Sequence, residues 1–482
     1  MTRRCGLCVA VVSLLAAFVQ GDDVPVSPER SSVWRTTSPA VDLVLPAERS
    51  AKTVGTENVD ALIHSLKERL DVLESRQKTL EAQPSAVLQA NDKGFALKSA
   101  DGNFFLKIKG DIHVDGQFYL NDGEHQIKDQ FFLRRVRPAL DVLVYGQFHG
   151  WIQLNLAPSV PTPLDDVYFE WLMSPLLNLR FGRFKPGVGL ENLQSSNVLS
   201  FIERSLVSNL VPLYDTGAGV HGVFGDGLFN YALAYGNGPV DGGTGDSEMT
   251  DRKDVNGRLF VLPFKNGSRD FLKDLGFGLG ASHGGGAGTA PATSPGLTAG
   301  YKSQGFNPPS FFFYNGNVVA IDNRTRWSPQ FYWYPGPVSV MVEYVASAQS
   351  VKTTAEDKAN LTHRAWQIAA GWVLTGDKTS FDGVKIKQNV DPKAGAWGAW
   401  EVVGRYSQLT VDNDAFSSFA TPFLSARMAR GWTGGINWYL NPAFKFQTNY
   451  AYTRFDGGAG SLAQVQDRKL ERSLFTRAVF SF

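Results

Sequence analysis

The chain has 482 residues but only two cysteines, Cys5 and Cys8, and both lie at the very start of the sequence. The remainder therefore contains no disulfide, no cysteine-based metal site and no thiol nucleophile. An excess of charge of one sign is also missing, because 47 basic residues face 46 acidic ones. Proteins whose main partner is nucleic acid carry an excess of lysine and arginine, so this balance argues against that class.

Long apolar runs are equally scarce. The most pronounced apolar run, at about residues 7–19, follows two arginines and is too short to span about 30 Å of hydrocarbon as a helix. A basic start, a short apolar run and a small residue, Gly21, before an acidic pair are typical of a secretory signal peptide, which we predict over residues 1–21. An uncleaved N-terminal anchor is the alternative. We expect no transmembrane helix elsewhere.

Motifs for catalysis are absent from the sequence as well. There is no P-loop, no His-Glu-x-x-His zinc spacing and no Gly-x-Ser-x-Gly nucleophile elbow. None of the seven histidines has a motif partner: His64, His113, His125, His149, His221, His283 and His363. We therefore predict a protein that is not an enzyme and that has no cofactor and no metal site.

Two segments precede the main domain. Residues 22–56 are rich in Pro, Ser, Thr and Val, which predicts a flexible linker. Residues 57–83 carry a heptad pattern, with apolar residues at most a and d positions and charges between them, until Pro84 ends it. About three heptads favour a coiled coil over 57–83, although the mixed a and d residues do not fix its oligomer number. A lone amphipathic helix on the main domain is the alternative.

From about residue 90 to residue 482, apolar and polar residues alternate, which predicts β-strands. Between residues 105 and 118, for example, the even positions are mainly apolar and the odd positions are polar or charged. The 49 glycines and 12% aromatic residues are also typical of a large β protein. The alternation recurs in residues 131–145, 324–333, 400–408 and 432–452.

The apolar faces carry Trp, Tyr and Phe near strand ends, as in the aromatic girdles that flank a lipid-facing band. Short turns such as 439–442 alternate with long Gly-rich stretches at 236–254 and 284–305, an asymmetry typical of periplasmic turns and external loops. We therefore predict an all-β fold, a transmembrane antiparallel β-barrel of about 16 strands over residues 90–482. A secreted β-sandwich or a stalked adhesin explains neither the aromatic faces nor Phe482, which ends an alternating last strand.

A series of short motifs runs through residues 90–482 in a specific order. They are Phe132-Leu-Arg-Arg-Val-Arg-Pro138, Phe181-Gly-Arg-Phe-Lys-Pro186 with Gly189-Leu-Glu191, Leu193-Gln-Ser-Ser196, Phe201-Ile-Glu-Arg204, Ser328-Pro-Gln-Phe-Tyr-Trp-Tyr334, Leu361-Thr-His-Arg-Ala-Trp366, Trp397-Gly-Ala-Trp-Glu401, Asn437-Trp-Tyr-Leu-Asn441 and Thr453-Arg-Phe-Asp456. Together they resemble the phosphate-selective porin O/P family of Gram-negative outer membranes. The resemblance implies a homotrimer of 16-stranded porins, each narrowed by an inward-folded loop, with a short periplasmic coiled coil in some members. It also implies arginines along the pore and a lysine at its constriction.

Nine cations are candidates for lining an anion path. The inward parity of the strands selects six of them, and the remaining three lie around Pro186 in the expected constriction loop. The nine are Arg135, Arg137, Arg183, Lys185, Arg204, Arg324, Arg326, Arg405 and Lys445. Rings of cations pass anions, and the planar guanidinium suits phosphate because it donates two parallel hydrogen bonds. The expected partners are small anions, phosphate among them, and outer-membrane lipid.

Several alternatives stay open for these residues. Two or three of the nine are expected to form structural ion pairs with wall carboxylates, and Glu191 and Glu203 can cancel positive charge in the loop. Arg183 requires a bulge or strand end, because its phase is otherwise lipid-facing. Arg134, off phase, is expected to extend along the surface at a strand end. Charge reversal of both Arg324 and Arg326 is expected to lower anion conductance. A general or other-solute-selective porin is the nearest rival, and an outer-membrane barrel enzyme is a more distant one.

Overall fold

The computed structural model describes residues 56–82, 86–91, 94–120, 128–158, 163–246, 251–286, 296–458 and 468–482. The chain divides into two compact units, Met1–Leu80 and Glu81–Phe482. The predicted signal peptide over 1–21 and nearly all of the predicted linker lie outside the described residues.

The first unit contains one long helix, α2 (Thr56–Ala82), which confirms the helix predicted over 57–83. Its apolar residues are exposed: Leu66, Leu70 and Leu73 are 56%, 57% and 62% exposed. Among the described helices, none is both long and apolar enough to cross a bilayer.

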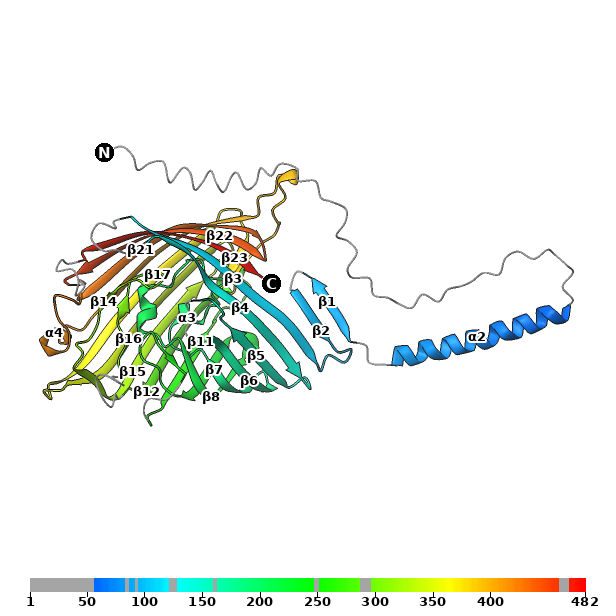
Figure 1. Cartoon of the computed structure of the whole chain (residues 1–482), viewed down its shortest axis with the longest axis horizontal. Helices are drawn as coiled ribbons and strands as arrows, with labels where there is room; N and C mark the ends of the chain where they lie inside the picture. Colours follow the sequence, from blue (N-terminus) through cyan, green and yellow to red (C-terminus); the bar gives the residue numbers. More distant parts are fainter. Residues whose placement is uncertain are drawn as a thin grey trace. The chain divides into compact units, whose positions relative to one another are not determined.

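The second unit is a closed barrel of antiparallel strands (Figure 1). The last strand of the ring pairs with the first, from Ser473 opposite Tyr119 to Ser481 opposite Asp111. In chain order the ring consists of β3 (Phe105–Tyr119), β4 (Gln130–Val144), β5 (Phe148–Leu154), β6 (Leu164–Ser174), β7 (Leu177–Phe184), β8 (Tyr214–Phe224), β9 (Phe229–Gly236), β11 (Asp254–Val261), β12 (Leu275–Gly284), β15 (Val318–Trp333), β16 (Val338–Thr353), β17 (Lys358–Val373), β20 (Ala399–Thr410), β21 (Met428–Asn441), β22 (Phe444–Asp456) and β23 (Leu470–Ser481). The prediction of about 16 strands is confirmed.

Shorter elements complete the unit. A hairpin of β1 (Val87–Asn91) and β2 (Gly94–Lys98) begins just before the predicted boundary at residue 90, and β2 pairs with the start of β3. Within the connections lie β10 (Thr244–Gly245), β13 (Tyr301–Lys302), β14 (Ser310–Phe312), β18 (Lys378–Ser380), β19 (Gly383–Lys385), α3 (Leu190–Leu193), α4 (Ala415–Ser418), η1 (Leu206–Leu210), η2 (Gly225–Gly227), η3 (Asp270–Leu272) and η4 (Pro392–Ala394).

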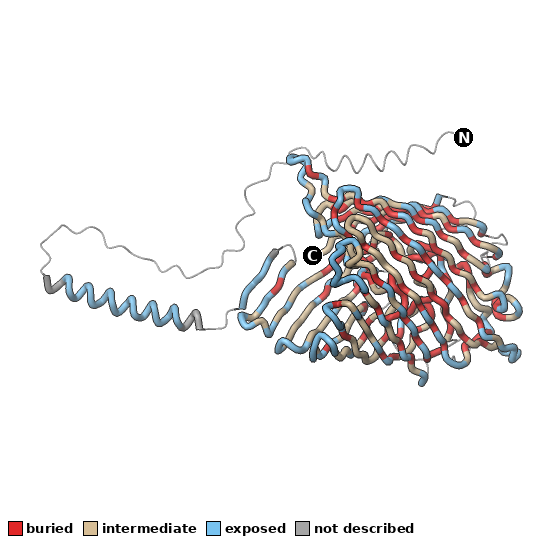
Figure 2. The backbone as a smooth tube through the Cα atoms, turned by 180° about the vertical axis from the view of Figure 1, so that it is seen from behind, coloured by how far each residue is buried: buried red, intermediate tan, exposed pale blue. Residues whose placement is uncertain are grey.

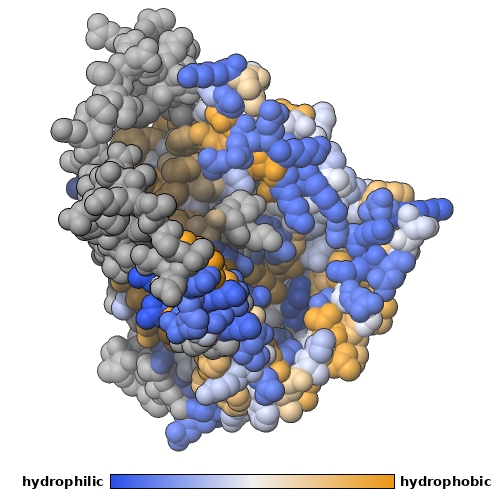
Figure 3. Space-filling model, turned by 90° about the vertical axis from the view of Figure 1, so that its right-hand side faces the viewer, coloured by the Kyte–Doolittle hydropathy of each residue, from blue (hydrophilic) through white to orange (hydrophobic). Residues whose placement is uncertain are grey.

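Residues along each strand alternate as the sequence predicts, so that one face of the strand points to the interior and the other to the outside. In β3, Ile112 and Val114 are 36% and 43% exposed, whereas their neighbours Asp111, His113 and Asp115 are at most 5% exposed. Buried and more exposed positions alternate along many strands in Figure 2. Figure 3 shows hydrophobic side chains lying open on the surface beside hydrophilic ones. An apolar outer wall around a polar interior is the pattern of a membrane barrel.

Aromatic side chains form two rows on the outer wall of β17 and β20–β22. In the outer aromatic row, successive rings of Trp366, Tyr406, Trp432 and Tyr452 lie 5.0, 5.2 and 5.6 Å apart. In the inner aromatic row, Trp438 lies 5.1 Å from Trp400 and 6.0 Å from Phe446. Such rows mark the two edges of the lipid-facing band, which confirms the predicted girdles.

The connections differ between the two ends of the barrel. At one end they include the short turns 145–147, 175–176 and 334–337, and at the other the long loops 185–213 and 285–317. By the usual asymmetry the first end is periplasmic and the second is external. One long segment, 374–398, departs from this pattern at the periplasmic end and carries β18 and β19.

The interior of the barrel is not polar throughout. The external loops 296–317 and 411–427 fold inward and bury an apolar core against β16, β17 and β20. Phe311 and Phe312 from the first loop are fully buried there, together with the inward-facing Val345 and Leu361. Inward positions are therefore apolar where a loop covers them, which strand parity alone does not reveal.

Truncating this inner core is expected to destabilise the barrel. Leu361→Ala removes a fully buried side chain and should cost about 2–5 kcal/mol. The measurement is the temperature at which the folded, fast-migrating form disappears on a denaturing gel. Ile368→Ala is the matched control, because Ile368 is 45% exposed on the outer face of the same strand. An equal loss of thermal stability in both variants would mean that the inner core stabilises the barrel no more than the outer face does.

Candidate functional site

The interior is narrowed by the loop of residues 185–213, which connects β7 to β8 and carries α3 and η1. Main-chain groups of this loop bind side chains of β21–β23 directly. Lys445 Nζ donates to Leu199 O at 2.9 Å, Asn437 Nδ2 donates to Ser200 O at 2.9 Å, and Ile202 N donates to Asn449 Oδ1 at 2.7 Å. One side of the loop is therefore fixed to this wall of the barrel.

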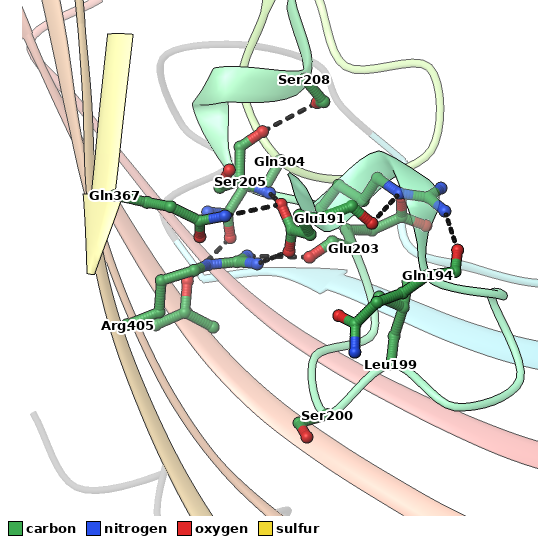
Figure 4. Close-up of polar contacts among 12 residues, drawn as sticks. Glu191, Gln194, Leu199, Ser200, Glu203, Ser205, Ser208, Gln304, Gln367 and Arg405 are labelled. Carbon is green, nitrogen blue, oxygen red and sulfur yellow. Dashed lines mark hydrogen bonds and ion pairs between the residues drawn. The ribbon is translucent and has the colours of Figure 1, made fainter. Parts of the chain in front are cut away.

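Glu191 is the central buried carboxylate of the attachment (Figure 4). Its Oε1 accepts from Arg405 Nη1 at 2.8 Å, and its Oε2 accepts from Ser205 N at 2.9 Å and Gln367 Nε2 at 3.1 Å. Arg405 also donates to the main-chain oxygen of Glu203 at 2.8 Å. Through Arg405 and Gln367, Glu191 thus holds the loop to β20 and β17.

Glu203 provides a second attachment, between arginines of two other strands. It pairs with Arg134 Nε at 2.9 Å and with Arg477 Nη2 at 3.4 Å. Burial opposes ionisation of Glu203, but the two guanidinium groups outweigh it and hold the pKa of this loop carboxyl at about 2. Arg134 therefore does not extend along the outer surface as expected. Arg134 is the extra residue of a β-bulge, since its neighbours Leu133 and Arg135 pair with the consecutive residues Val114 and His113, and the bulge turns it inward.

The opposite side of the loop carries a cationic cluster formed by Arg137, Lys185 and Arg204. Lys185 Nζ and Arg204 Nη2 donate to the same oxygen, Gln194 O, at 3.0 and 3.1 Å. Arg137 Nη1 reaches Ser196 Oγ at 2.7 Å, two residues further along the loop. The structure thus brings three of the nine candidates together around residues 194–196.

Two cavities flank this cationic cluster. One, of about 280 Å³, lies between the loop and the wall of β4–β8 and is lined by Arg137, Trp151, Gln153, Asp166, Tyr168, Arg180, Lys185, Leu193, Ser195, Ser196 and Tyr214. The other, of about 490 Å³, lies toward the external loops, and its charged lining residues are Arg134, Glu203, Arg204, Asp241 and Lys302. Cations outnumber carboxylates in both. Arg137 is partly neutralised by Asp165 at 2.7 Å, which does not line the first cavity.

The other candidates lie elsewhere in the barrel. Arg405 and Lys445 hold the loop as described, and Arg135 is buried beside His113 at 3.4 Å. Arg183 pairs with Asp246 and lies over the Tyr214 ring at 4.5 Å. The predicted interruption of its phase is confirmed, because Gly182 has a φ of 127° just before it and β7 ends at Phe184.

Arg324 and Arg326 converge on one buried carboxylate, that of Asp241 in the loop between β9 and β11. Arg326 Nε lies 2.8 Å from it and Arg324 Nε lies 3.7 Å away. Both arginines also donate to the main-chain oxygen of Pro239, at 2.8 and 3.1 Å. These contacts tie the loop to β15 and leave both guanidinium groups at most 2% exposed.

Replacing Arg326 is accordingly expected to change stability more than selectivity. Arg326→Gln leaves Asp241 in a buried site with only the more distant Arg324, at a cost of about 3–5 kcal/mol. Thermal denaturation followed on gels measures the loss, and the double variant with Asp241→Asn should regain part of it. A variant of normal stability with reduced anion selectivity would instead show that Arg326 contacts the ion path.

Sequence reasoning did not place three arginines that the structure brings into the interior around the loop. Arg180 lines the first cavity and pairs with Glu170 at 2.6 Å, and its even phase in β7 was the available signal. Arg477 binds Asp115 through two hydrogen bonds of 2.7 Å, and its inward parity in β23 was equally readable. Arg134 could not be found by parity, because the bulge reverses it.

The chain matches the model of the family described as phosphate-selective porin O and P over residues 106–466. It belongs to this family. Porin O of Pseudomonas aeruginosa is 26% identical over 400 residues, which cover 75% of this chain and 86% of that protein. The outer-membrane channel DcaP of Acinetobacter baumannii aligns with a TM-score of 0.50 and 10% identity over 80% of this chain and 99% of its own, a likeness of fold alone.

Membership in the porin O and P family agrees with the geometry of the barrel. The protein is an outer-membrane porin of a Gram-negative bacterium, and it is a channel rather than an enzyme. Its interior loop corresponds to the inward-folded loop that the sequence resemblance implied.

Proposed function

We propose that this porin conducts small anions selectively and that phosphate is the preferred anion. The observation that carries the proposal is the cationic cluster of Arg137, Lys185 and Arg204 beside residues 194–196. A phosphate moving between the two cavities exchanges water for these donors without leaving the aqueous lumen. The similarity to Porin O supports the same assignment.

The mixture of donor types suits passage rather than permanent capture. Arg137 and Arg204 offer planar guanidinium groups that match phosphate oxygens in pairs, whereas Lys185 acts as a point charge. Each of the three already donates to an oxygen of the protein, so an arriving anion competes with those bonds and is released readily. The hydroxyl of Ser196 gives phosphate a further hydrogen-bond partner in the same place.

We assign the nine candidate cations to two roles. Arg137, Lys185 and Arg204 line the path, and Arg183 lies beside it at the end of β7. Arg324, Arg326, Arg405 and Lys445 hold loops against the wall, and buried Arg135 adds positive potential behind the cluster.

The proposal extends to assembly and domain organisation. Exposed apolar a and d residues on α2 support a coiled coil over 57–83, and the protein then functions as a homotrimer with this segment in the periplasm. Residues 1–21 serve as a cleaved signal peptide and 22–56 as a linker, with the barrel over 90–482.

Single-channel recordings test the selectivity. Reversal potentials in a KCl gradient should show chloride to be more permeant than potassium, and a cation-selective result would refute the proposal. Adding phosphate should then reduce the chloride current at millimolar concentrations, because phosphate occupies the cluster longer. Equal sensitivity to sulfate and phosphate would support a general anion pore instead.

A further inference from the structure

Arginines on the outer wall of the barrel gather in a single sector. Within the described strands, each arginine that faces outward lies on β17, β21, β22 or β23: Arg364, Arg430, Arg454 and Arg472. Arg430 and Arg454 stand directly opposite each other on β21 and β22. Arg472 follows on β23, opposite Tyr452. We call these four residues the outer arginine sector.

The sector lies immediately outside the outer aromatic row. Arg364, Arg430 and Arg454 are each two residues from Trp366, Trp432 and Tyr452 on the same strand face, in the direction of the external loops. Aromatic rows mark the boundary between hydrocarbon and headgroups. The four guanidinium groups therefore stand at headgroup level in the outer leaflet rather than in bulk water.

The charge of Arg430 and Arg454 is poorly balanced. Like charges directly opposite each other on neighbouring strands destabilise a sheet. Asp456 pairs with Arg430 at 3.0 Å, but the guanidinium group of Arg454 makes no hydrogen bond or ion pair to any residue that the structure describes. Arg364 donates to a main-chain oxygen, Thr362 O, at 3.2 Å. The arrangement thus calls for an anionic group from outside the chain.

We propose that the outer arginine sector binds the phosphate groups of the anionic glycolipid of the outer leaflet, lipopolysaccharide, through its lipid A. Guanidinium groups bind phosphate oxygens in pairs, which explains why the sector consists of arginines. Below the arginines the wall offers room for acyl chains between the two aromatic rows. Nothing lies within 4 Å of a Cβ placed on Gly404, and at Gly434, which faces it across the strands, a Cβ would meet only Val403 O at 4.0 Å.

Binding of purified lipid A to the full-length protein tests the proposal. Native mass spectrometry in detergent with EDTA counts the bound lipids, and fluorescence of Trp432 and its neighbours follows the titration. Bisphosphorylated lipid A should bind the parent protein. Arg430→Gln combined with Arg454→Gln should weaken binding roughly thirty-fold, since each basic residue near an anionic surface raises the affinity about five-fold. Replacing both arginines with lysine should weaken it less.

Controls separate the possible sources of phosphate. Lys352→Gln, on the outer face of β16, removes one cation outside the sector and should leave binding unchanged. Dephosphorylated lipid A should bind weakly, and millimolar inorganic phosphate should not displace the intact lipid. Displacement by inorganic phosphate would show a site for the free anion and overturn the glycolipid assignment. Equal lipid binding by the parent protein and the double variant would also overturn the proposal. A change of oligomeric state in the variant would do the same, because it would place the sector between protomers.

The test is independent of the channel's selectivity. The variants leave the interior untouched, so reversal potentials should be the same in all of them. Heat-modifiable migration confirms that each variant is folded before lipid is added.

Discussion

Lys185→Glu is expected to abolish anion preference more completely than any other single substitution in the pore. The side chain lies beside Arg204 and near Arg137, so at pH 6, where Lys185 is charged, the substitution turns three cations into two cations and a carboxylate. Reversing one charge changes the energy of a monovalent anion 4 Å away by about 2 kcal/mol even at the dielectric constant of water. That energy corresponds to roughly a thirty-fold change in relative permeability, measured from reversal potentials in a KCl gradient.

Lys302→Glu is the matched control for this substitution. Lys302 lines the external cavity but is exposed to solvent, where salt screens its charge. Its reversal should shift the permeability ratio far less. Equal shifts in the two variants would mean that selectivity arises from the overall charge of the lumen and not from the cluster.

The same residue makes selectivity depend on pH. Burial, reinforced by Arg204, lowers the pKa of Lys185 in its loop to about 7. Its positive charge is therefore present below that pH and lost above it, so the anion-to-cation permeability ratio should fall as pH rises from about 6 to about 8. Lys185→Arg remains charged throughout this range and should remove the dependence. A dependence that survives in Lys185→Arg would have to come from another group.

Arg405→Met is expected to release the constriction. The substitution leaves Glu191 buried without its cation, and breaking a buried pair in this way costs about 3–5 kcal/mol. The loop should then detach locally from β17 and β20, giving a larger and noisier single-channel conductance with weaker selectivity. Planar-bilayer recording measures all three quantities.

Two further variants make this prediction specific. Arg364→Met removes an arginine from the outer face of β17 and should leave the conductance unchanged. Adding Glu191→Gln to Arg405→Met neutralises the buried charge and should restore part of the loop's order. If Arg405→Met conducts like the parent, the bonds from Asn437 and Lys445 hold the loop without the ion pair.

The barrel itself could be predicted because its physics is local. Alternation along β3 or β22, aromatic side chains near strand ends and the lengths of connections are all readable within a few residues. Arg137 was predicted in the same way from its parity in β4, and Lys185 from its position directly after β7. The burial of Phe311 and Phe312 inside the barrel could not be predicted, because loops that fold inward bury residues against strands far away in sequence.

The pairing of charges was out of reach for a similar reason. Glu191 meets Arg405 across 214 residues, and no local pattern identifies such partners. Inward parity placed Arg324, Arg326 and Arg405 correctly on the interior face, but it could not tell a cation open to the lumen from one buried under a loop. A single extra residue in β4 was enough to reverse the expected direction of Arg134.

The attachment of the 185–213 loop to one wall has a consequence for how such a channel can evolve. Most of the residues that hold the loop come from β16, β17 and β20–β23, with Arg134 of β4 as an exception, whereas much of the first cavity's lining comes from β4–β8. Substitutions at Gln153, Tyr168 or Arg180 can therefore alter which solutes pass while the loop stays in place. Solute preference and the attachment of the loop are thus encoded largely on different walls, so a new specificity can be acquired with little loss of stability.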